Sequence, residues 1–240
     1  MIELGVPNCW KRVKMKVMTV IPARGGSKSV PKKNLREING KTLIERAILA
    51  ALKIPLNEVY VSSDDSEILD IALHLGVNAI ERSEKNSSDE ATSESVILET
   101  LSKIANPSNI ITLLQPTSPF IDIESWSCAL VDIKGNKNID SMFSVVEKNE
   151  FLWELVNDKW RPVNHDRILR LPRQKRPRTV IETGSFYIFR REIFEIEKTR
   201  FCGNTRPAIT KNWSSFDIDS LDDFQLCVKL GEILDLLSGS

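Results

Sequence analysis

The sequence predicts a three-layer α/β fold in which helices cover both faces of a mostly parallel sheet. Short apolar runs alternate with amphipathic segments of helical period over the first half of the chain, and this alternation is typical of parallel strands joined by crossover helices. The 240 residues are enough for one substantial domain. Lys plus Arg equals Asp plus Glu at 33 each, so the overall charge does not favour nucleic acid or an acidic membrane, and any anion site must be local.

The period of the apolar residues places the elements in chain order. Apolar and β-branched runs predict strands at 17–21, 58–62, 77–80, 110–114 and 142–146. Helical spacing predicts helices over 41–53, over a segment carrying Ile68 and Leu75, over a segment carrying Val96 and Ile104, and over 122–134. Asp64 and Glu67 can form a capping box for the second of these helices, and Gly76 is placed to end it.

The chain leaves this pattern between Glu147 and Thr183. This segment contains two tryptophans, several prolines and a basic run from Arg167 to Arg178, so we expect an excursion from the main sheet. The basic run would also fit a nucleic-acid patch, but the zero net charge and the lack of a matching domain pattern argue against that partner. Residues 182–188 return to the sheet, and a long helix follows. Its core side is expected to carry Leu221, Phe224, Cys227, Val228, Ile233 and Leu234.

Composition also bears on the compartment and on metals. Residues 1–15 lack the apolar core of a signal peptide and are expected to form a loose extension before a domain at 16–240. No apolar stretch approaches the length of a membrane span. The four cysteines are widely spaced and only two histidines occur, which favours neither a Cys/His metal cluster nor a disulfide framework. We therefore expect reduced thiols in a cytoplasmic protein without a membrane partner.

The stretch from Ile21 to Asn34 has the composition of a polyphosphate-binding turn. It follows a predicted strand, and its two adjacent glycines permit a tight turn. Amide and ammonium groups together can match the charge of a triphosphate; the cations here are Arg24, Lys28, Lys32 and Lys33, with Ser27 as a hydroxyl donor and Asn34 as an amide for a base or ribose. A hairpin with solvated lysines is an equally good interpretation of composition alone, since neither a Walker A motif nor a dinucleotide fingerprint is present.

Two polar segments also follow predicted strands. Residues 81–95 contain Arg82 and Ser93 among many polar side chains, and Gln115 begins a proline-rich loop directly after the strand at 110–114. Ligands of open α/β sheets bind beyond the carboxyl ends of the strands, so Gln115 is a candidate for a ligand contact. By itself the first segment is expected to be a solvated loop, and the alternative for the second is a proline-rich turn with a helix cap.

The Asp217-Ile218-Asp219 segment is a candidate metal site. In an extended segment, side chains two residues apart project to the same side, so both carboxylates can meet one ion. Two carboxylates completed by water and phosphate oxygens suit Mg²⁺. The alternative is capping, because acidic residues are favoured at a helix start, and the two roles are compatible.

Several of these segments resemble the signatures of the acylneuraminate cytidylyltransferase (CMP-sialic acid synthetase) family. The first family pattern, A-R-x-x-S-K-x-x-P-x-K-N, is filled at every fixed place by Ala23, Arg24, Ser27, Lys28, Pro31, Lys33 and Asn34. Similar strings follow in the family order, at Arg82 with residues 89–93, at 113–119, at Pro172-Arg173-Gln174, at 182–188 and at 217–219. Thr183 is a departure, because it stands where the family usually has Asn.

The resemblance implies a Rossmann-like nucleotide-binding domain with a small dimerisation arm at 147–183. It implies transfer of CMP from CTP to the anomeric hydroxyl of a nine-carbon 2-keto acid sugar, with Mg²⁺ as cofactor and a homodimer as the assembly. The catalytic residues would be Lys28, Asp217 and Asp219, with both aspartates as metal ligands. The substrate-binding residues would be Arg24, Ser27, Lys33, Asn34, Arg82, Ser93 and Gln115, and Arg173 would meet the sugar carboxylate.

Two alternatives remain at this point. Cytidylyltransferases that use the eight-carbon sugar Kdo resemble this layout, but their first loop lacks the Ser27-Lys28 and Lys33-Asn34 pattern. A catalytically silent nucleotide-binding protein on the same fold is the second alternative, and the intact Asp217, Asp219, Lys28 and Lys33 argue against it.

Overall fold

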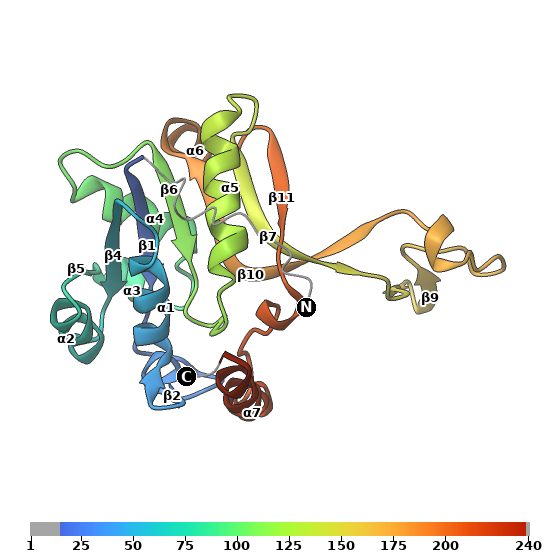
Figure 1. The fold of residues 1–240 in the computed structure, drawn as a ribbon, viewed down its shortest axis with the longest axis horizontal. Helices are drawn as coiled ribbons and strands as arrows, with labels where there is room; N and C mark the ends of the chain where they lie inside the picture. Colours follow the sequence, from blue (N-terminus) through green and yellow to red (C-terminus); the bar gives the residue numbers. More distant parts are fainter. Residues whose placement is uncertain (1–14, 239–240) are drawn as a thin grey trace.

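A computed structural model describes residues 15–238 of the chain, so most of the expected N-terminal extension lies outside the described residues. A seven-stranded sheet runs through the domain in the order β11-β7-β10-β6-β1-β4-β5 (Figure 1). Among these strands only β10 runs antiparallel to its neighbours, β6 and β7; the other pairs are parallel. The strands are β1 (Val17–Pro22), β4 (Asn57–Ser63), β5 (Asn78–Glu81), β6 (Ile110–Leu114), β7 (Ser141–Lys148), β10 (Thr179–Arg190) and β11 (Thr205–Ile209).

Helices cover both faces of this sheet, which confirms the three-layer α/β prediction. On one face, α1 (Leu43–Leu52), α2 (Ser66–His74) and α5 (Ile123–Gly135) bury residues such as Ile44, Ile68 and Trp126 against the strands. On the other face, α4 (Ser93–Ser102) and α6 (Arg191–Glu197) bury Ile97 and Phe194. No helix in the described part of the chain is both long and apolar enough to cross a membrane.

A third apolar cluster brings the C-terminal segment against the turn after β1. Helix α7 (Leu221–Ser238) packs on the small hairpin formed by β2 (Glu37–Ile38) and β3 (Lys41–Thr42). The approach is close at Gly231, where a Cβ atom would lie 2.7 Å from Cγ2 of Ile38. This packing carries the Asp217–Asp219 segment to the carboxyl end of β1, far from its place in the sequence.

Three local expectations need correction. Helix α2 is capped by Asp65, whose side chain accepts from the backbone N–H of Glu67, because Asp64 is turned toward the loop after β1. Leu221 and Ile233 are exposed, at 46% and 53%, so the apolar face of α7 is narrower than predicted. Cys128 is disulfide-bonded, which contradicts the expectation of reduced thiols there, whereas Cys202 and Cys227 are free and buried.

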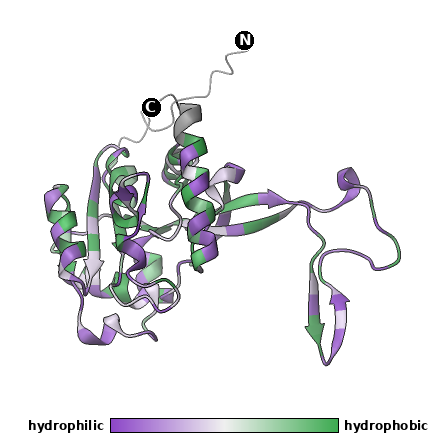
Figure 2. Ribbon diagram, turned by 90° about the horizontal axis from the view of Figure 1, so that it is seen from below, coloured by the Kyte–Doolittle hydropathy of each residue, from purple (hydrophilic) through white to green (hydrophobic). Residues whose placement is uncertain are grey.

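The segment between β7 and β10 projects away from the domain as an arm, residues 147–183 (Figure 1). The paired ends of β7 and β10 form its stem. Beyond the stem, β8 (Trp153–Val156) and β9 (Lys159–Pro162) form a hairpin, in which Asn157 and Asp158 both have positive φ, as a two-residue type I′ turn requires. Figure 2 shows hydrophobic residues along the arm as well as in the sheet.

Candidate active site

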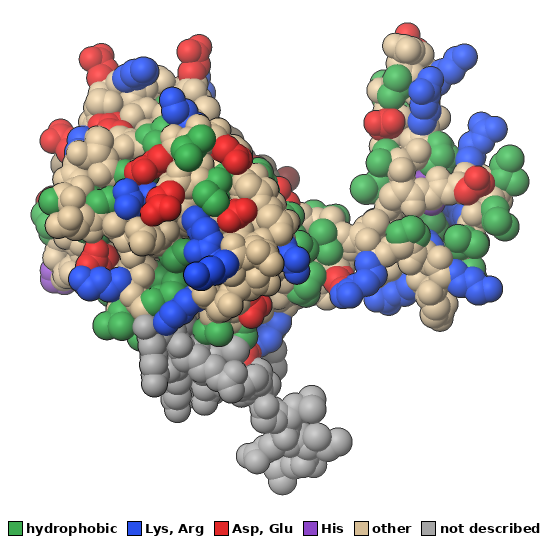
Figure 3. All heavy atoms as spheres, turned by 90° about the horizontal axis from the view of Figure 1, so that it is seen from above, with side chains coloured by type: hydrophobic (Ala, Val, Ile, Leu, Met, Phe, Trp, Pro, Cys, Tyr) green, Lys and Arg blue, Asp and Glu red, His purple; other side chains and the backbone are tan. Residues whose placement is uncertain are grey.

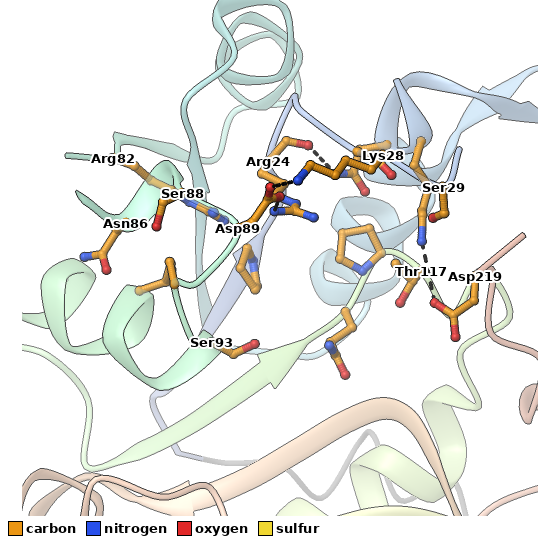
Figure 4. A pocket seen from close by; sticks show the side chains of 18 residues that line it. Arg24, Lys28, Ser29, Arg82, Asn86, Ser88, Asp89, Ser93, Thr117 and Asp219 are labelled. Atoms are coloured by element: carbon orange, nitrogen blue, oxygen red, sulfur yellow. Dashed lines mark hydrogen bonds and ion pairs between the residues drawn. The ribbon is translucent and has the colours of Figure 1, made fainter. Parts of the chain in front are cut away.

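A polar cavity of about 470 Å³ opens at the carboxyl ends of the parallel strands. Its walls come from the loop after β1, the segment after β5, the loop after β6 and the segment before α7 (Figure 4). This is the position at which open α/β sheets bind ligands. Of the residues expected at the site, the cavity is lined by Arg24, Ser27, Lys28, Lys33, Asn34, Arg82, Ser93, Gln115 and Asp219.

The loop after β1 is fixed by backbone contacts. The N–H of Gly25 donates to Oδ1 of Asp64 at 3.0 Å, and a Cβ atom at Gly25 would lie only 2.6 Å from Oδ2 of Asp65. Only glycine therefore fits without a shift of the neighbouring loop. The side-chain amide of Asn34 donates to the carbonyl of Arg24 at 2.9 Å, so part of its hydrogen-bonding capacity holds the turn rather than a ligand.

The cations of this loop divide among three sets of partners. Nζ of Lys32 lies 3.4 Å from Oε2 of Glu67 in α2. Arg24 and Lys28 both reach Asp89, with 2.6 Å between Nη1 of Arg24 and Oδ1 of the carboxylate. Lys33 is buried and turns the other way, donating to the carbonyl of Ile218 at 2.5 Å, with Nζ 3.7 Å from Oδ1 of Asp219. The sequence grouped these cations together, whereas in the structure the side chain of Lys33 contacts the C-terminal segment.

Arg82 forms part of the opposite wall. Its guanidinium donates to the carbonyl of Ser62 from Nε at 3.1 Å and from Nη2 at 2.8 Å, and to the Ser62 hydroxyl at 3.1 Å. Burial lowers the pKa of Arg82 to about 10, so the group remains a cation at neutral pH. A fixed positive charge at the cavity wall suits an anionic ligand.

Glu99 of α4 holds the wall segment that follows Arg82. Its carboxylate accepts from the backbone N–H of Ser83 at 2.8 Å, from Nζ of Lys103 at 2.7 Å and from the side chain of Asn86. Burial alone would raise the pKa of Glu99, but these hydrogen bonds lower it to about 2. Helix α4 therefore anchors the short helix α3 (Glu84–Ser87), and Asn86 itself lines the cavity.

Gly184 lies beside both the loop after β6 and the C-terminal segment. Its φ of 73° is in the left-handed region. A Cβ atom there would lie 3.5 Å from Oε1 of Gln115, 3.6 Å from Oγ of Ser118 and 3.8 Å from Oδ2 of Asp217. The preceding Thr183 is turned away, since its hydroxyl donates to Oγ of Ser144 in β7 at 2.7 Å. The hydroxyl of Thr183, the residue that departs from the family pattern, is thus hydrogen-bonded within the sheet.

Asp217 and Asp219 are the two carboxylates of the C-terminal segment. Asp219 lines the cavity and its side chain is 83% exposed. Although Asp217 keeps solvent-accessible surface, desolvation by its neighbours and the charge of Asp219 raise its pKa. No group of three or more His, Cys, Asp and Glu side chains in the described residues could hold a metal ion. Carboxylate oxygens are nevertheless the ligand type that a hard cation completed by water and phosphate oxygens takes.

Two expected site residues, Asp217 and Arg173, do not line this cavity: Asp217 lies on the segment that carries Asp219, whereas Arg173 is on the arm. Arg173 lies there in a 3-10 turn, Arg173–Lys175. Figure 3 shows several Lys and Arg side chains on this arm. With the Asn149 amide oriented to accept, its Oδ1 lies 3.1 Å from Nε and 3.2 Å from Nη2 of Arg173. The guanidinium is therefore oriented within the arm.

Sequence reasoning missed the residues that position others. Asp64, Glu99 and Ser118 act through hydrogen bonds with Gly25, Asn86 and Thr183, respectively. The polar string Ser62-Ser63-Asp64-Asp65 at the end of β4 was a usable signal, because it also lies at a carboxyl end. The role of Glu99 had no local signal, since it depends on how α4 packs.

Comparison with known proteins agrees with this geometry. The cytidylyltransferase family matches residues 18–210. N-acylneuraminate cytidylyltransferase A of Danio rerio is 33% identical over 77% of this chain and 44% of its own, and the N-acylneuraminate cytidylyltransferase of Streptococcus agalactiae is 30% identical over 88% and 52%. The chain thus spans about half the length of these relatives. CMP-N,N′-diacetyllegionaminic acid synthase of Legionella pneumophila is 30% identical over 91% of this chain and 97% of its own.

Solved structures show the same fold. CMP:2-keto-3-deoxy-manno-octonic acid synthetase complexed with CTP superposes with a TM-score of 0.69 at 20% identity, covering 90% of this chain and 98% of the other. The 2-C-methyl-D-erythritol 4-phosphate cytidylyltransferase of Francisella tularensis gives a TM-score of 0.64 at 14% identity, covering 90% and 99%. At these identities the likeness concerns the fold alone. Family match, relatives and fold together show that the chain belongs to the cytidylyltransferase family.

Proposed function

We propose that this protein transfers CMP from CTP to the anomeric hydroxyl of a nine-carbon 2-keto acid sugar and releases pyrophosphate. The observation that carries the proposal is the cavity itself, in which cations of the loop after β1 face the Asp217–Asp219 segment at the carboxyl ends of the parallel strands. The relatives named as N-acylneuraminate and diacetyllegionaminic acid enzymes support this choice of acceptor.

The proposed reaction is a displacement at the α-phosphorus. The sugar hydroxyl forms the new P–O bond, the bond between the α-phosphorus and the bridging oxygen breaks, and pyrophosphate leaves with the electron pair. Arg24 and Lys28 would neutralise the departing phosphates, and Asp217 or Asp219 can accept the hydroxyl proton. Catalysis then depends on positioning and charge stabilisation, without a covalent enzyme intermediate.

Mg²⁺ is the proposed cofactor, with Asp217 and Asp219 as its protein ligands. When bound, the ion would supply charge neutralisation for the phosphates. Lys33 contacts the same segment: its buried ammonium donates to the carbonyl of Ile218, which lies between the two aspartates in the sequence. That contact fixes the backbone of the segment, and so limits the positions its carboxylates can take.

The arm is proposed to complete the acceptor site of a second subunit. Arg173 lies on a segment that projects away from its own domain (Figure 1), and large apolar residues of the arm are exposed, including Trp160 at 64% and Ile168 at 90%. A homodimer would cover such residues and could bring Arg173 to the sugar carboxylate at the neighbouring cavity. A cytoplasmic location, where CTP is present, is part of the same proposal.

The test is turnover of CTP with a panel of acidic keto sugars. Sialic, legionaminic and pseudaminic acids and Kdo would each be supplied with CTP and Mg²⁺, and both pyrophosphate and the CMP-sugar would be quantified. We expect a nine-carbon acid to be used at least tenfold better than Kdo in kcat/KM. Preference for Kdo would replace the proposed acceptor, and CTP binding without turnover on any acid would indicate a silent nucleotide-binding protein.

A further inference from the structure

Asp89 places a negative charge inside the proposed triphosphate site. Its carboxylate lies between Arg24 and Lys28 in the cavity, with Oδ1 2.6 Å from Nη1 of Arg24 and Oδ2 on the ammonium of Lys28 (Figure 4). Hydrogen bonds from Lys28 and Arg24 lower the pKa of Asp89, so it is ionised at neutral pH. The two cations best placed for phosphate oxygens are therefore already paired with an internal anion.

The position of Asp89 in the chain allows this contact to open. Asp89 lies in the turn between α3 and α4, outside any helix or strand, and its side chain is 44% exposed. The Glu99 contacts to Ser83 and Asn86 hold the N-terminal side of this turn, and Thr92 caps α4 on the other side. Only the few residues between these two anchors have to move.

We propose that Asp89 is an internal competitor for the phosphate site, displaced by the triphosphate and returning to Arg24 and Lys28 as pyrophosphate leaves. The proposal rests on the function proposed above. Any anion that binds Arg24 and Lys28 must first separate them from Asp89. The free-energy cost of breaking these two ion pairs is therefore the same for CTP and for pyrophosphate. CTP can offset that cost through its base and ribose, whereas pyrophosphate has only its phosphates. The carboxylate would thus weaken retention of the product.

If Asp89 had the opposite role, its removal would change the affinity for phosphate ligands in the opposite direction. If the carboxylate served to hold Arg24 and Lys28 in place for phosphate oxygens, its removal would weaken the binding of every phosphate ligand. If it competes, its removal strengthens their binding. Exposed ion pairs have modest strength and two of them are lost together, so we expect a change of about three- to tenfold in Kd.

The experiment measures pyrophosphate binding by isothermal titration calorimetry, without CTP, acceptor or turnover. Wild type is compared with Asp89→Asn, which removes the charge at nearly constant shape, and with Asp89→Glu, which keeps it. Glu90→Gln is the matched control, because it removes the same charge from the exposed neighbouring residue. Thermal unfolding of each variant establishes that the fold is kept.

We expect Asp89→Asn to bind pyrophosphate three- to tenfold more tightly than wild type, with Glu90→Gln and Asp89→Glu within about twofold of it. CTP binding should tighten by a similar factor, and product inhibition by pyrophosphate should become stronger. Weaker or unchanged pyrophosphate binding in Asp89→Asn, no binding in either protein, or equal tightening in Glu90→Gln would each overturn the proposal. Failure of the proposed function would instead appear as an absence of CMP-sugar formation, which this titration does not involve.

Discussion

The proposed nucleotide cavity and the arm differ in how many of their side chains have partners within the same chain. Around the cavity, functional side chains have internal partners: Lys33 has a backbone carbonyl, Arg82 has Ser62, and Arg24 has Asp89. Along the arm, Leu155, Trp160 and Ile168 remain 56%, 64% and 90% exposed. The cavity is therefore organised within a single chain, whereas the arm presents an apolar surface that its own domain does not cover.

This difference assigns separate roles to the two basic regions of the sequence. The cations of the loop after β1 are packed at the ends of strands, in a cavity that also contains Gln115 and Asp219. Arg173 has a similar charge but lies on the arm, oriented by Asn149. Sequence composition treats both as basic runs, and position in the fold separates the proposed triphosphate site from the arm proposed to reach a second subunit.

The largest effect should follow from removing the carboxylate that the cavity exposes. We predict that Asp219→Ala lowers turnover at least about 10³-fold, because the metal would lose one of its two protein ligands. The fold should be unchanged, since this side chain is 83% exposed. Steady-state turnover across a Mg²⁺ titration, with circular dichroism for the fold, makes the measurement. Asp222→Ala is the control, and a near wild-type rate in Asp219→Ala would refute the metal assignment.

The next effect separates the cavity from the arm directly. Lys28→Ala should lower kcat/KM for CTP about 10²-fold, equal to about 3 kcal/mol, through a weaker charge match to the triphosphate and to departing pyrophosphate. Arg173→Ala should chiefly raise KM for the sugar acid. Each substrate is varied separately in steady state, and CTP binding is titrated in both variants. Loss of CTP binding in Arg173→Ala, with Lys28→Ala intact, would reverse the two assignments.

A stability measurement tests whether the cavity wall depends on internal contacts. The folded pKa of Glu99 is about 2, below the ordinary value of 4.5. The ionised carboxylate therefore contributes to the free energy of unfolding above pH 4.5, and this contribution is lost as pH falls toward 2. We predict that the free energy of unfolding of Glu99→Gln is about 2 kcal/mol lower than that of wild type at pH 7, and that this difference shrinks below pH 4. Urea unfolding across this pH range gives the result.

The control for this measurement is Glu232→Gln, which removes a pair with Lys229 that lies at the surface, where the two side chains are 72% and 50% exposed. Its cost should stay below about 0.5 kcal/mol. A pH-independent difference for Glu99→Gln would show that the carboxylate charge does not hold the wall.

The smallest effect is expected on CTP binding when the arm is changed. Leu155 and Trp160 are cross-strand partners in the β8–β9 hairpin, and Leu155→Asp with Trp160→Asp should dissociate the proposed dimer by placing charges in its interface. CTP affinity should stay within about twofold of wild type, because the cavity belongs to one chain, while transfer to the acceptor should fall. Sedimentation velocity reports the assembly. A wild-type monomer with full activity at micromolar concentration would contradict this picture.

Local sequence determined the elements and the edge of the sheet at which the site forms. Apolar period fixed β1, β4 and β6, α1 and α5, and the polar residues directly after these strands marked the cavity side. Errors arose where local signals compete. Both Asp64 and Asp65 can cap α2, and the choice was made by the loop after β1, which takes Asp64 through the N–H of Gly25.

Tertiary structure alone decided which charged groups meet. Lys33 reaches the carbonyl of Ile218, 185 residues away, and Arg24 reaches Asp89 across 65 residues. Arg173, expected at the sugar carboxylate, lies on the arm, where it was predicted to be. Charge and hydrogen-bonding type are properties of a residue and can be read from its neighbours in the sequence. The partner of a charge depends on the order of strands in the sheet and on the packing of α7 and α4, which no local spacing encodes.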